Sequence, residues 1–180
     1  MRLFIAVNFS EEIKDELFHI SDKLKQFSER GSFSLKDNIH LTVIFLGEVK
    51  NSKIETIKIS MDDSVKNISS FPIIIEDIGN FKRNDGLILW LGINDNENLN
   101  LIHKNLSKNL SDKGFEMEKR RYSPHLTLGR RVVFKEDFND LKKALNFPPI
   151  KFTLNHIDLM KSERINNRMV YTNIHSSFFK

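Results

Sequence analysis

Apolar residues recur at helical spacing in four segments of the chain. These segments cover residues 13–27, 54–68, 99–110 and 138–145. Steps of three and four between the apolar positions place them on one face of a helix, so four amphipathic helices are predicted. Ser10 is suited to cap the start of the first helix, and Ser52 with Glu55 predicts a capping box for the second.

Short runs rich in branched and aromatic residues lie between these helices and predict strands. They cover residues 2–8, 39–46, 71–78, 86–93, 124–133, 151–160 and 168–176. Helices and strands alternate without a linker or a low-complexity stretch, which predicts an α/β or α+β chain with a substantial sheet. We expect residues 1–180 to form a single domain.

Composition excludes several classes of protein. The 180 residues include no cysteine, which excludes disulfides, thiolate metal sites and cysteine nucleophiles. No apolar run approaches the roughly 20 residues of a membrane helix. The apolar start at residues 3–7 is too short for a signal sequence, so we expect a cytoplasmic protein. Nucleotide-binding glycine loops, a GxSxG elbow and an HExxH zinc motif are all missing, and a net charge of +4 is too small to identify a partner.

One short motif occurs twice, about half the chain apart. Residues 39–44 read Ile-His-Leu-Thr-Val-Ile, and residues 124–129 read Pro-His-Leu-Thr-Leu-Gly. Each copy is His-Leu-Thr followed by an apolar residue, and each lies in a predicted strand. A single copy is typical of a histidine satisfied by its neighbours, whereas two matched copies favour a functional site.

The spacing of the motif has a chemical meaning, because residues i and i+2 of a strand project from the same face. His40 and Thr42 therefore point together, as do His125 and Thr127, while the intervening leucines point into apolar packing. Two imidazoles at one site can act as a general acid and a general base near neutral pH. The threonine hydroxyls can hydrogen-bond an oxyanion.

Positive charge gathers around the second copy of the motif. The basic residues there are Lys119, Arg120, Arg121, Arg130, Arg131 and Lys135. The guanidinium group of arginine is suited to binding phosphate oxygens, although clusters of basic residues also occur as solvent-exposed surface without a ligand. Strict alternation from His125 places Arg131 on the same face, but a bulge at Gly129 would place Arg130 there instead. Two histidines, two threonines and an arginine are suited to phosphodiester chemistry without a metal.

Paired HxTx strands resemble the signature of the 2H phosphoesterase superfamily. The chain is most similar to its bacterial and archaeal RNA 2′,3′-cyclic phosphodiesterase branch, also called 2′-5′ RNA ligase. The segments that carry this resemblance are Arg2-Leu3-Phe4-Ile5-Ala6-Val7, Asn38-Ile39-His40-Leu41-Thr42, Phe45-Leu46-Gly47-Glu48-Val49, Ser123-Pro124-His125-Leu126-Thr127-Leu128-Gly129-Arg130 and Leu159-Met160-Lys161-Ser162-Glu163. They extend over nearly the whole chain.

The resemblance implies an α+β fold of two similar lobes, each an antiparallel sheet backed by helices, with a central cleft that carries both motifs. It implies that His40 is the proton donor and His125 the proton acceptor in hydrolysis of RNA 2′,3′-cyclic phosphate ends to 2′-phosphomonoesters. It also implies phosphate binding by Thr42, Thr127 and Arg130, with Arg131 as the alternate. With a 5′-hydroxyl RNA end replacing water, the same proton transfers account for 2′-5′ ligation.

The partners that follow are RNA with 2′,3′-cyclic phosphate ends, such as tRNA fragments, or small cyclic nucleotides. No cofactor, metal or membrane is expected, and we expect a monomer.

Family members often carry lysine or arginine where this chain has Ile44, which puts in question how a polynucleotide is held. A non-catalytic RNA-binding module is a third possibility. Phe45 and Trp90 are expected in the core, and the other four histidines are expected to be structural.

Overall fold

The computed structural model describes residues 1–145 and 147–180. Its helices are α1 (Glu11–Gln26), α2 (Ile54–Val65), α3 (Glu97–Asp112) and α4 (Phe138–Ala144). All four predicted helices are confirmed, and the Ser10 hydroxyl caps α1 by accepting from the Ile13 amide. The predicted capping box is wrong. A 3₁₀ turn at Asn51–Lys53 precedes α2, and the Lys53 side chain at the N-cap forms no capping hydrogen bond.

Two antiparallel sheets complete the fold. The strands are β1 (Arg2–Val7), β2 (Ser28–Phe33), β3 (Leu41–Glu48), β4 (Phe71–Arg83), β5 (Gly86–Ile93), β6 (His125–Phe134), β7 (Ile150–Leu154), β8 (His156–Ile165) and β9 (Arg168–Phe178). The four-stranded sheet has the order β3-β1-β8-β9 and the five-stranded sheet the order β2-β6-β5-β4-β7. The expected α+β fold of two antiparallel lobes backed by helices is confirmed.

Two strands differ from the sequence prediction. Strand β2 was not predicted, because its sequence Ser-Glu-Arg-Gly-Ser-Phe has no apolar alternation and it lies at the edge of its sheet. The predicted strand over residues 151–160 is two strands, β7 and β8, separated at Asn155. The chain passes there from the five-stranded sheet to the four-stranded sheet.

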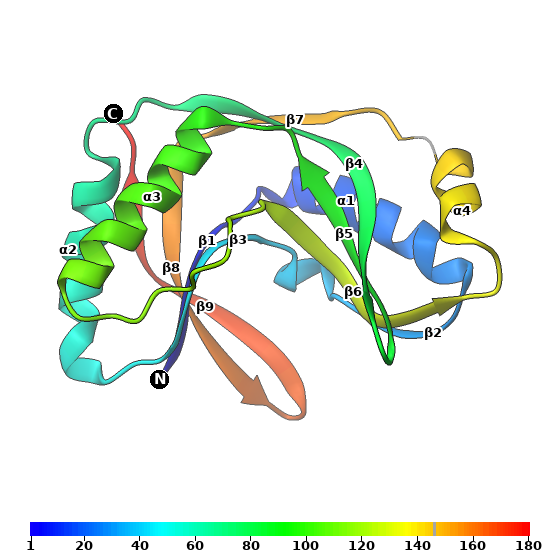
Figure 1. Ribbon diagram of the computed structural model, residues 1–180, viewed down its shortest axis with the longest axis horizontal. Coiled ribbons are helices and arrows are strands. Elements are labelled where there is room, and N and C mark those ends of the chain that lie inside the picture. The colour runs from blue at the N-terminus through cyan, green and yellow to red at the C-terminus, as the bar shows by residue number, and fades with distance from the viewer. Residues whose placement is uncertain (146) are drawn as a thin grey trace.

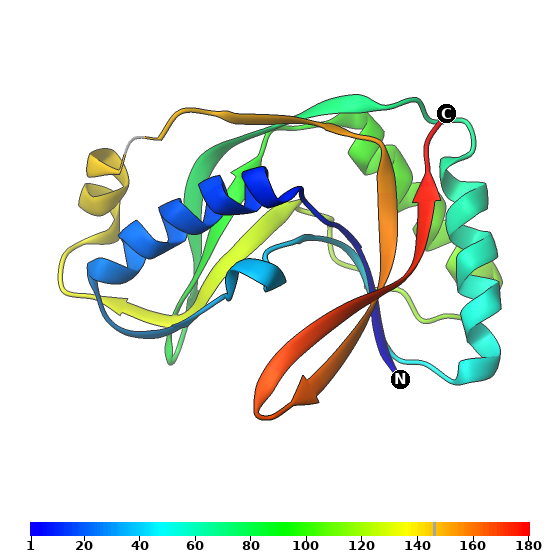
Figure 2. The same cartoon turned by 180° about the vertical axis from the view of Figure 1, so that it is seen from behind.

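Helices α1 and α3 cover the sheets in a crossed manner (Figure 1). Helix α1 follows β1 of the four-stranded sheet but packs against β2 and β7 of the other. Helix α3 follows β5 of the five-stranded sheet but packs against β3, alongside α2. The reverse view shows α1 lying across the five-stranded sheet (Figure 2). The units β1–α1 and β5–α3 therefore each contribute a helix to the opposite lobe, whereas α2 follows β3 and packs against β9 of the same sheet.

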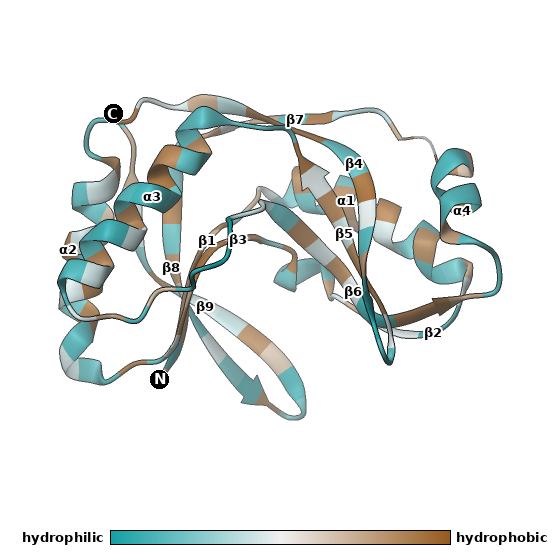
Figure 3. Ribbon diagram, in the orientation of Figure 1, coloured by the Kyte–Doolittle hydropathy of each residue, from teal (hydrophilic) through white to brown (hydrophobic). Residues whose placement is uncertain are grey.

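One continuous apolar core underlies both sheets. It includes Ile5 and Leu41 from the four-stranded sheet and Leu91 and Leu126 from the five-stranded sheet, all completely buried. Apolar positions concentrate along the strands, whereas polar positions occupy the outer sides of the helices (Figure 3). In the described ranges, no helix combines the length and the hydropathy that crossing a membrane requires.

Candidate active site

The two HxTx motifs occupy equivalent places in the two sheets. His40 immediately precedes β3, and His125 is the first residue of β6. Leu41 and Leu126 are completely buried in the core, as the alternation predicts. The histidines and threonines are half-buried on the opposite side of each sheet. We call the sides that carry the histidines the site faces.

Each catalytic candidate is anchored through the same ring atom. His40 Nδ1 lies 2.7 Å from the Asn38 carbonyl oxygen, and His125 Nδ1 lies 2.7 Å from the Ser123 carbonyl oxygen. A carbonyl oxygen only accepts hydrogen bonds, so Nδ1 of both rings carries a proton and donates it. Nε2 of each ring is thereby left for proton exchange. In His40 this atom lies 3.0 Å from the Thr42 hydroxyl.

Aromatic rings surround both imidazoles. The His40 ring centre lies 4.9 Å from that of Phe4 and 5.2 Å from that of Tyr171, which meets it edge-on. The His125 ring centre lies 5.2 Å from that of Phe81 and 6.4 Å from that of Trp90. These rings restrict the rotation of the imidazoles and exclude water from their sides.

The prediction that Trp90 lies in the core is wrong. Trp90 pairs with Thr127 and shares its face of the sheet, where its half-buried indole ring lies over Gly79. A Cβ atom at Gly79 would overlap that ring, so glycine is required there. The sequence of β5 alone does not show that Trp90 pairs with Thr127. With that pairing known, the alternation of side chains places Trp90 on the face that points away from the core.

A bulge follows the threonine of the first motif. Ala6 pairs with Thr42 and Ile5 pairs with Ile44, which leaves Val43 as an extra residue. Val43 and Ile44 are therefore both buried, and Phe45 lies on the face opposite to the one that strict alternation gives it, until a second register shift at Leu46 reverses the switch. Phe45 consequently lies on the site face and is 62% exposed, so its predicted place in the core is wrong. Position 44 lies in the core, where a basic side chain would be buried.

A matching bulge follows the threonine of the second motif. Trp90 pairs with Thr127 and Leu89 pairs with Gly129, which leaves Leu128 as the extra residue. Arg130 therefore occupies the position in β6 that Phe45 occupies in β3. The geometry favours Arg130, which the resemblance indicates, over Arg131, which strict alternation indicates. Arg131 has a left-handed backbone with φ of 55°, a further departure from regular strand geometry.

Contacts between the sheets bring the two motifs together. The Tyr122 hydroxyl, three residues before His125, donates to the Thr42 carbonyl oxygen over 3.3 Å. In return, the Ser34 hydroxyl, from the segment that leads to the first motif, donates to the Thr127 carbonyl oxygen over 3.0 Å. Each motif is thus braced by the segment that precedes the other.

The electrostatic environment of His40 favours its neutral form in the free protein. Burial is the main cause that lowers the pKa of His40, the Asn38 carbonyl opposes this, and the positive charge of Arg130 lowers the pKa further. Arg130 therefore acts on the histidine of the opposite sheet. A bound phosphate anion would offset the charge of Arg130 and favour protonation of His40.

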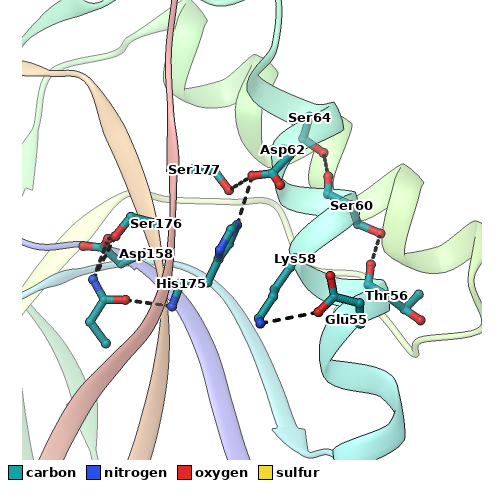
Figure 4. A network of polar contacts seen from close by, with 11 residues as sticks. Glu55, Thr56, Lys58, Ser60, Asp62, Ser64, Asp158, His175, Ser176 and Ser177 are labelled. Carbon is teal, nitrogen blue, oxygen red and sulfur yellow. Dashed lines mark hydrogen bonds and ion pairs between the residues drawn. The ribbon is translucent and has the colours of Figure 1, made fainter.

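The other histidines have structural surroundings. His175 Nε2 lies 3.0 Å from Asp62 Oδ1 of α2, which also accepts from the Ser177 hydroxyl (Figure 4). His156 lies 3.4 Å from the buried carboxylate of Asp158. His103 stacks on Tyr122 at 4.2 Å, and burial lowers the pKa of His103. His19 is exposed on α1 and contacts neither motif.

Comparison with known protein families matches residues 13–166 to the 2′-5′ RNA ligase superfamily. Two similar proteins are named RNA 2′,3′-cyclic phosphodiesterase. That of Methanocaldococcus jannaschii is 36% identical over 179 residues, covering 95% of this chain and 96% of that protein. That of Thermotoga maritima is 31% identical over 163 residues, covering 90% of this chain and 87% of that protein.

Solved structures show the same fold at lower identity. TT0787 of Thermus thermophilus superposes with a TM-score of 0.82 at 19% identity, over 99% of this chain and 98% of that chain. Escherichia coli LigT complexed with 3′-AMP superposes with a TM-score of 0.81 at 24% identity, over 99% and 97%. These two likenesses concern the arrangement of the helices and sheets.

Proposed function

Since the chain belongs to the 2′-5′ RNA ligase superfamily, we propose that it hydrolyses RNA 2′,3′-cyclic phosphate ends to 2′-phosphomonoesters. The observation that carries the proposal is the matched anchoring of His40 and His125, whose Nδ1 atoms both donate to a carbonyl oxygen two residues earlier. One core underlies both sheets, which supports residues 1–180 acting as one catalytic domain.

The proposed reaction needs one proton acceptor and one proton donor. Nε2 of neutral His125 takes a proton from water while the water oxygen forms a bond to phosphorus. The bond between phosphorus and O3′ breaks, and O3′ takes the Nε2 proton of His40. The phosphate remains on O2′, and the two histidines end with their protonation states exchanged. A 5′-hydroxyl RNA end in place of water would give a 2′-5′ linkage.

Three side chains are suited to holding the phosphate. Thr42 and Thr127 lie beside the two histidines on the site faces, and their hydroxyls can donate to phosphate oxygens. Arg130 supplies a fixed positive charge that acts on His40, so a phosphate bound there lies between a cation and the proton donor. The proposed steps use these side chains and no metal ion.

Phe45 is suited to binding the base of the terminal nucleotide. Its ring is 62% exposed on the site face, and its centre lies 6.2 Å from that of Phe4, which packs on His40. Bases of single-stranded RNA stack on exposed aromatic side chains of this kind.

The test uses purified protein with a chelator and RNA that ends in a 2′,3′-cyclic phosphate. We expect conversion to the 2′-phosphate, identified by comparison with authentic 2′- and 3′-phosphate ends. His40→Ala and His125→Ala are each expected to lower kcat by about 10²–10⁴-fold, as for loss of one general acid or base. His19→Ala, at an exposed histidine of α1, serves as the matched control and should retain full activity.

Three results would contradict the proposal. These are the absence of turnover, a 3′-phosphate product, and full activity in both variants of the motif histidines. The alternative of a non-catalytic RNA-binding module predicts salt-sensitive RNA binding that the histidine substitutions leave unchanged, without turnover.

A further inference from the structure

The β8–β9 hairpin extends beyond the rest of its sheet (Figure 1). Strand β8 pairs with β1 as far as Ser162, which lies opposite Arg2, whereas β8 and β9 continue to pair until Ile165 and Arg168. The end of the hairpin is therefore a two-stranded ribbon. Such ribbons are marginally stable by themselves, so the contacts that hold this one are informative.

The hairpin is attached directly to the first motif. The Asn38 side-chain amide donates to the Met169 carbonyl oxygen of β9 over 2.9 Å, while the Asn38 carbonyl accepts from His40 Nδ1. Tyr171, two residues further along β9, meets the His40 ring edge-on at 5.2 Å. The hairpin thus begins beside the proposed proton donor and leads away from it.

The two faces of the hairpin differ. Ser162 pairs with Tyr171 and Arg164 pairs with Met169, so these four residues share one face by the alternation of strands. Tyr171 packs against Phe4 and Met160, which identifies this face as the continuation of the site face. The pair of Ile165 and Arg168 points to the opposite side.

The site face of the hairpin carries positive charge without an internal partner. Arg2 shares this face, and its Cα is diagonal to that of Arg164 at about 7–8 Å. The neighbouring acids are engaged elsewhere, because Glu163 pairs with Lys161 at 2.6 Å and Glu48 with the amino terminus at 3.2 Å. Neither guanidinium forms an ion pair within residues 1–145 and 147–180.

We propose that this face of the hairpin binds the RNA nucleotides that precede the cyclic phosphate. Arg2 and Arg164 hold backbone phosphates, and the exposed Met169 and the Tyr171 ring contact bases or riboses. Arginine forks match phosphate oxygens, and methionine packs against aromatic groups of varied shape. The proposal rests on the proposed function and deepens it, since it names oligonucleotides as the preferred substrate over mononucleotides.

The position of Arg164 explains this preference. Ser162 pairs with Tyr171, and Arg164 lies two residues beyond Ser162 along β8. Arg164 is therefore about 7 Å further along the hairpin than Tyr171. A mononucleotide with its phosphate at His40 has no second phosphate to place there, whereas an RNA strand has one. A polynucleotide can thus be held although position 44 carries no basic side chain.

The experiment compares a nucleoside 2′,3′-cyclic phosphate with a tetranucleotide that has the same 3′ end. We expect the protein to have a higher kcat/KM for the tetranucleotide at low salt. Arg164→Ala should lower this value about tenfold, as for loss of one charge-assisted hydrogen bond. It should also reduce the slope of log(kcat/KM) against log[salt] by about 0.7. The same variant should leave mononucleotide turnover unchanged.

Arg168→Ala is the matched control, because Arg168 is an exposed arginine on the opposite face of the same hairpin. It should behave as the unsubstituted protein with both substrates. Arg2→Ala provides a second variant on the site face and should share the selective effect of Arg164→Ala. Melting temperatures of all three variants establish that the fold is retained.

Equal kcat/KM for both substrates would overturn the proposal, as would equal effects of Arg164→Ala and Arg168→Ala, while the proposed function would stand. If no cyclic phosphate is hydrolysed, the proposed function fails. Fluorescence anisotropy with a 2′-phosphorylated tetranucleotide then still decides the matter, because Arg164→Ala should weaken binding about tenfold relative to Arg168→Ala.

Discussion

Replacing Asp158 with asparagine tests the buried polar network at the centre of the four-stranded sheet. Asp158 is 1% exposed and lies on β8. Its Oδ2 accepts from the Asn8 amide at 2.7 Å, and its Oδ1 accepts from Ser176 at 2.6 Å and Asn173 at 3.0 Å. His156 Nε2 lies 3.4 Å from Oδ2. The substitution keeps the shape of the side chain and removes its charge.

The expected loss of stability is large. Hydrogen bonds to a charged group contribute about 1.5–3 kcal/mol and neutral ones about 0.5–1.5 kcal/mol, so each bond is weakened. The new amide group would also direct a donor at donors of Asn8 or His156. Weakening the hydrogen bonds from Asn8, Ser176 and Asn173 by about 1–1.5 kcal/mol each costs about 3–5 kcal/mol in total. In a protein of this size, that loss lowers the melting temperature by roughly 6–20 °C.

The effect should depend on pH, because the pair shifts both pKa values. The carboxylate of Asp158 raises the pKa of His156 above its ordinary 6.5. The stability that protonated His156 contributes is therefore complete below pH 6.5 and disappears as the pH rises through the raised pKa. Burial acts to raise the pKa of Asp158, but its hydrogen-bond donors outweigh burial and hold that pKa below 3.8. The stability that the ionised Asp158 carboxylate contributes is therefore complete above pH 3.8 and disappears as the pH falls through the lowered pKa.

Urea unfolding followed by circular dichroism from pH 4 to pH 9 provides the assay. The difference in unfolding free energy between the unsubstituted protein and Asp158→Asn should be largest near pH 5–6 and should shrink above pH 7. Ser176→Ala removes one donor and should cost only about 1–3 kcal/mol, because the carboxylate keeps its other partners. A substitution at Asp158 that costs less than Ser176→Ala, or a difference independent of pH, would refute the reasoning.

Three further predictions concern the proposed active site. Arg130→Gln removes a charge that lowers the pKa of His40, so the alkaline limb of the pH profile of kcat/KM should move to higher pH. An unmoved limb would contradict the assignment of His40 as donor. Phe45→Ala should raise KM about 5–100-fold for nucleoside cyclic phosphates, as for one lost base stack, but not for ribose 2′,3′-cyclic phosphate, which has no base. Equal effects on both substrates would exclude stacking. Tyr122→Phe removes the hydroxyl that braces Thr42 and should lower kcat by up to about 100-fold with a change in melting temperature of only about 2–4 °C. Unchanged kcat would show that the brace has no effect on catalytic geometry.

Local patterns in the sequence were sufficient for much of the fold. The apolar stripe of α3 predicted its four completely buried residues, because helix periodicity depends on the chain alone. The alternation around His40 and His125 likewise predicted which side chains face the core. The resemblance then supplied the pairing of the two lobes, which no local pattern contains.

The bulges at Val43 and Leu128 could not be predicted in this way. A bulge is a property of two paired strands, and the sequence of one strand does not reveal its register with another. Strict alternation consequently placed Phe45 in the core and favoured Arg131 over Arg130. The glycine at position 129 indicated a bulge one residue away from its actual place at Leu128, and no glycine lies next to the bulge at Val43.

The crossed arrangement of α1 and α3 has a consequence for how the protein unfolds. The helix that packs against β3 comes from the second half of the chain, so a fragment of residues 1–96 would leave the apolar side of β1 and β3 without α3. We expect such a fragment to aggregate and the whole chain to unfold in one cooperative step. A nucleotide bound at either motif should therefore protect backbone amides against hydrogen exchange in both sheets.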